Sequence, residues 1–166
     1  MTQILDALHL IFTGVAPGDI PEKGDFWQPC ILPGLLGLNV IMGFDRANGP
    51  MPDTAFPYLL IEPSAIIPGP VLGAKKASII FDVGVRQTGR LGARLGNGKA
   101  KGIADYATAL DAYLSDNQAL RTPDGKAHAS GITVQSLDFS AKGSTSGPWS
   151  AKRYATLQVE INYRRH

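Results

Sequence analysis

The chain has 166 residues, of which 44% are hydrophobic and 18% charged, so one globular domain spanning residues 1–166 is predicted. No stretch approaches the roughly 18 consecutive apolar residues of a membrane helix, which excludes such a span and predicts no membrane partner. Cys30 is the only cysteine, so a disulfide framework is excluded as well. The start, MTQILDALHL, lacks the basic region of a secretory signal, which predicts synthesis in the cytoplasm.

The net charge of +2 conceals an asymmetry between the two halves of the chain. Residues 1–83 carry four basic and eight acidic groups, whereas residues 84–166 carry twelve basic and six acidic groups. This separation predicts that one face meets an oppositely charged surface, on a neighbouring copy or on a polyanion. An ordinary mixed surface is the alternative interpretation.

The first part of the chain predicts one helix followed by a long loop-rich segment. Apolar residues recur at helical spacing from Ile4 to Phe12, with Thr2 as a possible N-cap and Gly14 as a natural stop. Residues 14–73 then hold ten of the twelve prolines, so sparse regular structure is expected there. The same segment is too apolar for simple disorder, so we expect it to pack on its own core or on a partner.

The remaining elements are predicted from hydrophobic periodicity. Period-two alternation or short apolar runs indicate strands, and 3.6-residue spacing indicates a helix. A shift of phase in the third strand predicts a bulge near Gln135 or Ser136. Together they favour an α+β fold with a mainly antiparallel sheet of about four strands, on which two helices pack. The elements are strands at Tyr58–Ile61, Ile79–Arg86, Ile132–Phe139 and Tyr154–Tyr163, and a helix at Ile103–Leu114.

The sequence offers no recognisable catalytic, metal or cofactor site. His9, His128 and His166 have no nucleophile or acid placed beside them by spacing, and one cysteine with three scattered histidines makes no metal-ligand pair. The stretch TGRLGARLGNGKAKG fails the phosphate-loop pattern, because Ala93 and Ala100 stand where a glycine and a hydroxyl residue are required. We therefore predict no enzyme activity and no cofactor.

Residues 88–102 are predicted to form a mobile basic arm. Five glycines lie between residues 89 and 102, and the segment has no acidic residue. Three interpretations stay open: binding to a protein partner, a solvated loop without a partner, or contact with nucleic-acid phosphates. The candidate partner-binding residues are Arg90, Arg94, Lys99 and Lys101.

The order of these elements resembles the tail terminator (tail completion) proteins of long-tailed bacteriophages and prophages. The resemblance covers roughly residues 54–165 and leaves out most of the proline-rich 14–73 segment. It is carried by the first helix and by the segments FPYLLIEP, IIFDVGVRQTG, IADYATALDAYL, ITVQSLDF and WSAKRYATLQVEINYRR.

The resemblance implies a non-enzymatic virion protein of the tail or neck. Members form a ring, commonly hexameric, that caps the tail tube, stops its polymerisation and joins it to the head connector. It implies a tail tube protein and a head-completion protein as partners, with possible transient contact to DNA in the lumen. Another head–tail neck protein, a basic nucleic-acid-binding module and an enzyme of unrecognised type are the alternatives.

A ring subunit needs two unlike faces, which the acidic first half and the basic second half of the chain could supply. The length of the last strand also suggests that it pairs its edge with a neighbouring subunit through backbone hydrogen bonds. The candidate interface residues are Tyr154, Thr156, Gln158, Glu160 and Arg164.

Overall fold

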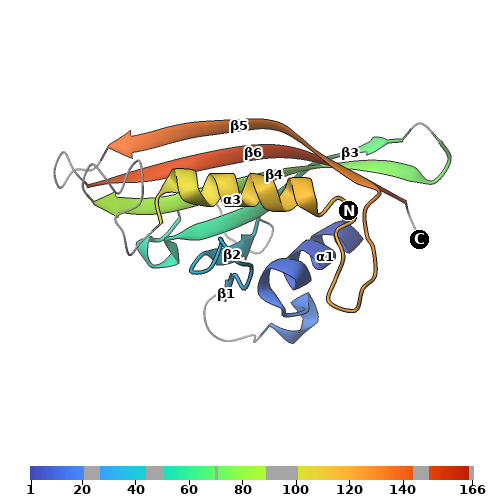
Figure 1. The fold of residues 1–166 in the computed structure, drawn as a ribbon, viewed down its shortest axis with the longest axis horizontal. Helices are drawn as coiled ribbons and strands as arrows, with labels where there is room; N and C mark the ends of the chain where they lie inside the picture. Colours follow the sequence, from blue (N-terminus) through green and yellow to red (C-terminus); the bar gives the residue numbers. More distant parts are fainter. Residues whose placement is uncertain (21–26, 44–50, 70, 89–100, 144–149, 165–166) are drawn as a thin grey trace.

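A computed structural model of the chain describes residues 1–20, 27–43, 51–69, 71–88, 101–143 and 150–164. One face of a single sheet carries both α-helices (Figure 1). None of the described helices is long and apolar enough to cross a membrane. In chain order the elements are α1 (Thr2–Thr13), the 3₁₀ turn η1 (Pro17–Asp19), β1 (Gln28–Pro29), β2 (Asn39–Met42), the 3₁₀ turn η3 (Asp53–Ala55), β3 (Tyr58–Pro68), β4 (Ala74–Thr88), α3 (Ile103–Asp116), β5 (Gly131–Gly143) and β6 (Ser150–Arg164).

The sheet has six strands in the order β1-β2-β3-β4-β6-β5, and it is mixed. β2 runs parallel to β3, whereas the other neighbours are antiparallel. The prediction of a mainly antiparallel sheet of about four strands is therefore wrong, although two helices do pack on it. The two missing strands come from the proline-rich segment, where the four-residue run of β2 buries Val40 and Met42 on one face and Ile41 on the other. Strands this short carry too few residues for periodicity to reveal them.

The main core lies between the sheet and the two helices. Alternate residues of β4 and β6, including Phe81 and Leu157, are completely buried against α1 and α3. Leu35 and Leu38 of the proline-rich segment join the same core, so this part of the segment packs on its own domain, one of the two predicted outcomes. On the opposite face, the described residues form a small apolar cluster of Ile41, Ala55, Tyr58 and Leu60.

The helices begin and end close to the predicted residues. α1 starts after Met1, so the prediction of Thr2 as the N-cap is wrong by one residue, and it ends at Gly14 in the left-handed region with φ of 73°. The Gly102 amide at the start of α3 donates to the Asp105 carboxylate over 2.8 Å. This bond satisfies one of the amides that a helix N-terminus leaves without an internal partner.

All four predicted strands exist, and each is longer than predicted. β3 continues through Pro63 to Pro68, where it forms a hairpin with the start of β4. Beyond Ile61 it pairs with β4 alone among the described strands, and a proline is tolerated on such an edge. The predicted bulge in β5 is confirmed by a register shift between Val134 and Ser136.

Candidate interaction surfaces

Neither described histidine is arranged for catalysis. His9 is buried, and its Nδ1 lies 2.8 Å from the Val15 carbonyl oxygen at the end of α1. Nε2 of His128 lies 3.2 Å from the Thr122 hydroxyl, which itself donates to Asp124 over 2.5 Å. That hydrogen bond is the main cause of the lowered pKa of Asp124. In a catalytic triad the carboxylate accepts a hydrogen bond from the imidazole and orients it. Here the Asp124 carboxylate accepts from the Thr122 hydroxyl instead.

Metal ligands do not gather in the described part of the chain, where no group of three His, Cys, Asp or Glu side chains is placed to hold an ion. Cys30 is buried beneath the end of α1 and joins the main core. Burial raises the pKa of its thiol, so the reactive thiolate is disfavoured.

The predicted basic arm falls mostly outside the described residues, including Arg90, Arg94 and Lys99. Lys101 is described and exposed, and its ammonium lies 6.0 Å from the centroid of the Tyr106 ring. Lys101 therefore lies just before the start of α3. Contact between the arm and a partner stays a prediction.

The terminal strand β6 lies inside the sheet. Residues 151–162 pair with β4 on one side and with β5 on the other. Because both edges of this stretch are occupied, the prediction that it pairs its edge with a neighbour is wrong. The sequence showed the length of the strand but not its position in the sheet.

The predicted interface residues of β6 alternate with its buried residues and thus share the face opposite the helices. Thr156 donates a hydrogen bond to Asp82 of β4, and Glu160 forms an ion pair with Lys76 at 3.0 Å. Gln158 is exposed between them. Tyr154 stacks edge-on against Phe56, and Arg164 is exposed at the far end. Their contact with another subunit stays a prediction.

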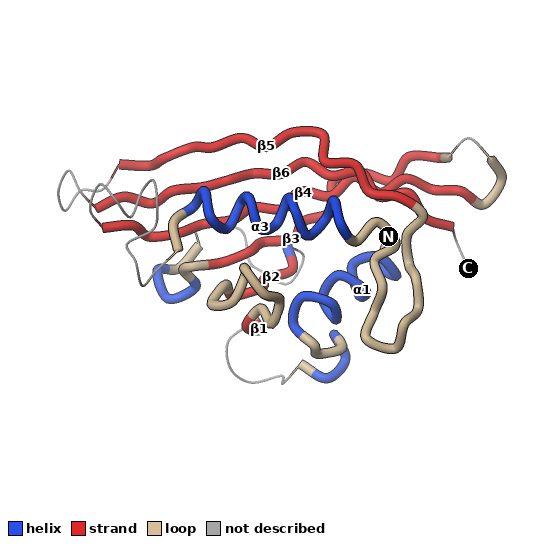
Figure 2. Tube along the Cα trace, in the orientation of Figure 1, coloured by secondary structure: helices blue, strands red, loops and turns tan. Residues whose placement is uncertain are grey.

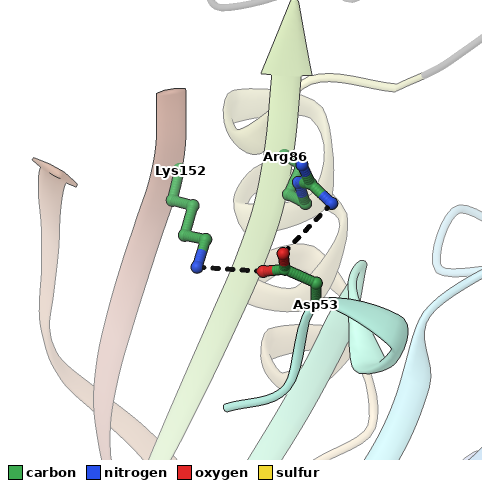
Figure 3. Close-up of polar contacts among 3 residues, drawn as sticks. All are labelled: Asp53, Arg86 and Lys152. Atoms are coloured by element: carbon green, nitrogen blue, oxygen red, sulfur yellow. Dashed lines mark ion pairs between the residues drawn. The ribbon is translucent and has the colours of Figure 1, made fainter. Parts of the chain in front are cut away.

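A cluster of three charged side chains marks one end of this face (Figure 3). Asp53 of η3 lies 3.1 Å from Lys152 and 3.6 Å from Arg86, which face each other across β4 and β6. The pKa of Asp53 is lowered by its hydrogen bond with Lys152 and then by both positive charges. Lys152 also lies 5.2 Å from the centroid of the Phe56 ring. Sequence reasoning missed the cluster because the register of β4 on β6 and the position of η3 bring its members together.

The ion pairs also bear on the predicted separation of charge. Asp53 and Lys76 belong to the acidic half of the chain, whereas Arg86, Lys152 and Glu160 belong to the basic half. Strands from both halves interleave in one sheet, so these pairs join the halves. The prediction that each half supplies its own charged face is therefore wrong for this part of the molecule.

Besides the outer side of the two-residue strand β1, two unlike open surfaces lie on the described part of the sheet. One is the β3–β4 hairpin, residues 64–78, which projects beyond both helices and the end of β5 (Figure 2). The other is the β5 edge, residues 131–140, whose outer side pairs with no described strand. Hairpin side chains with large exposed fractions are Ile66 (51%), Ile67 (43%), Val71 (57%) and Leu72 (104%), and on the β5 edge Phe139 is 57% exposed.

Comparison with known proteins adds no identification, because no protein-family model matches the chain and no curated protein matches it.

Proposed function

We propose that this chain is a non-enzymatic assembly protein that forms a closed ring on the end of a phage tail tube. The observation that carries the proposal is the pair of unlike open surfaces on a single sheet. A contact between two different patches repeats from copy to copy, and it generates a ring when the rotation closes. Four exposed apolar side chains within seven residues, Ile66 to Leu72, are typical of a surface that another protein covers.

The family resemblance supports the same proposal. The six segments that carry it lie in α1, β3, β4, α3, β5 and β6, in the secondary structure that each pattern predicts. A terminator ring would end tube polymerisation and offer its other side to the head connector, which places the protein in the tail or neck of the virion. Another neck protein of the head–tail junction is the nearest alternative.

Light scattering coupled to size exclusion tests the proposal. We expect a discrete species near six times the 17.6 kDa chain mass, either alone or after addition of the tail tube protein from the same genome. Electron microscopy of growing tubes provides the functional assay, in which the added chain arrests elongation. A strict monomer that neither binds nor arrests tubes would contradict the proposal.

The nucleic-acid alternative makes a different prediction in the same conditions. Binding through phosphate contacts weakens steeply with salt, because each contact releases counterions. Titration of labelled DNA between low and physiological salt therefore separates a DNA-binding module from an assembly protein.

A further inference from the structure

We propose that the β3–β4 hairpin of one copy docks on the β5 edge and the adjoining α3 surface of the next copy. This inference rests on the proposed ring, for which it names the joining surfaces. The bound partner is a second copy of this chain, because the two surfaces carry opposite charges and both expose apolar side chains.

The hairpin is an apolar projection with basic residues. Its tip is closed by two backbone hydrogen bonds, from the Gly69 amide to Ala74 over 2.9 Å and from the Ala74 amide to Val71 over 3.0 Å. Residues 64–78 include Lys75 and Lys76 and no acidic residue. A preformed tip loses little conformational entropy on binding, which favours its use as an anchor.

The receiving surface has the opposite charge. α3 lies over β5, β6 and β4, and residues 103–116 include three aspartates and no basic residue (Figure 1). The β5 edge adds Asp138, on the face opposite the helices, and no basic residue between positions 131 and 140. Next to Asp138, Phe139 lies on the face that carries the helices, where its ring is more than half exposed. The three helical residues are Asp105, Asp111 and Asp116.

Charge decides between a contact of unlike surfaces and a contact of like surfaces. Two hairpins packed together would bring Lys75 of one copy against Lys75 of the other, whereas Lys76 is already paired with Glu160 of its own chain. Two β5 edges would bring the aspartates together. Like charges at an interface are costly, whereas hairpin against edge pairs Lys75 with carboxylates around apolar side chains. The contact is therefore head-to-tail, as ring closure requires.

The outer edge of β3 is a poor strand for pairing, since Pro63 and Pro68 have no amide hydrogen to donate. The hairpin therefore contributes mainly side chains, and the apolar contact runs from Ile66 and Leu72 to Phe139. The Ile132 amide of β5 already donates to Gln118, so unpaired backbone groups of residues 133–140 accept or donate the remaining hydrogen bonds.

Mixing two complementary variants tests the proposal. Ile66→Glu with Leu72→Glu places carboxylates on the hairpin, and Phe139→Lys places a cation on the β5 edge. All three positions are more than half exposed, so both proteins should fold, which circular dichroism and the urea midpoint check. Each variant alone should be monomeric where the wild type is a ring. Their mixture should give one-to-one complexes of two chains or a larger even number, because a wild-type hairpin docks on a wild-type edge and the second contact brings Glu against Lys.

A matched control is Leu36→Glu, which changes an exposed apolar residue (58%) outside both surfaces and should leave the ring intact. If both designed variants still form the wild-type ring, the docking proposal is wrong while the ring-forming function stands. If the mixture stays monomeric, the head-to-tail contact is likewise contradicted.

Chemical cross-linking tests the contact even where the wild-type chain stays monomeric and the proposed function fails. Leu72→Cys and Phe139→Cys are made separately, and Cys30 should react slowly with a bismaleimide because it is buried, which the wild-type chain checks. A cross-linked dimer is expected only when the two variants are mixed. A dimer formed by Leu72→Cys alone, or none in the mixture, would overturn the proposal.

Discussion

Substitution of Gly84 by alanine tests how tightly β3 and β4 pack at the small apolar cluster. Gly84 lies opposite Tyr58, whose ring crosses it. A Cβ atom at position 84 would lie 2.4 Å from Cε1 and 2.5 Å from Cζ of that ring. The ring cannot move freely, because Tyr58 is 6% exposed and packs edge-on against Phe56 with centroids 4.9 Å apart. Overpacking of this kind costs about 1–3 kcal/mol, which lowers Tm by about 2–4 °C for each kcal/mol in a chain of this size.

Urea unfolding of four proteins measures the effect: wild type, Gly84→Ala, Tyr58→Ala and the double variant. In the double variant the ring is gone, so the alanine at position 84 should cost little. The coupling free energy should be about 1–3 kcal/mol. Gly18→Ala is the matched control, since no atom lies within 4 Å of its added Cβ. An unchanged midpoint for Gly84→Ala, or strictly additive effects with Tyr58→Ala, would refute the reasoning.

Three further predictions concern a buried ring, a side-chain hydrogen bond and the buried thiol. Phe12→Ala removes a fully buried ring of α1 and should reduce the free energy of unfolding by about 3–5 kcal/mol in urea, whereas exposed Leu36→Ala should change it little. Gln118→Ala removes the side-chain oxygen that accepts from the Ile132 amide over 2.6 Å, so unfolding should become easier by about 1–3 kcal/mol and exchange of that amide should accelerate. Native Cys30 should react with a thiol reagent at least tenfold more slowly than the urea-unfolded chain, because burial raises its pKa and blocks access. Equal rates would contradict this.

Local patterns in the sequence predicted the helices and the longer strands well. The 3.6-residue spacing of Ile4 to Phe12 and the strict alternation from Tyr154 to Tyr163 each require one buried face, and both have it. The phase shift in β5 predicted its bulge, because an extra residue changes which side chains face the core. These features depend on neighbours along the chain, which the sequence contains.

Features that depend on pairing between distant segments were missed or wrong. β1 and β2 are too short to show a periodic pattern. They exist because β1 pairs with β2 and β2 pairs with β3. The β3–β4 hairpin was interpreted as loop, since prolines normally interrupt a strand, yet β3 is an edge strand there among the described residues. The charged cluster follows from the register of β4 on β6, which places Arg86 opposite Lys152, and from the position of η3, which brings Asp53 to them.

The sequence by itself determined which segments are helical or extended, because side-chain period sets which face of each element is apolar. Only the tertiary structure decided which strand edges are covered. β6 has the clearest strand pattern, but its position between β4 and β5 uses both edges over most of its length. The open surfaces used in the proposals lie instead on β5 and on the β3–β4 hairpin. Strand order results from long-range packing and hydrogen bonding, which no local pattern encodes.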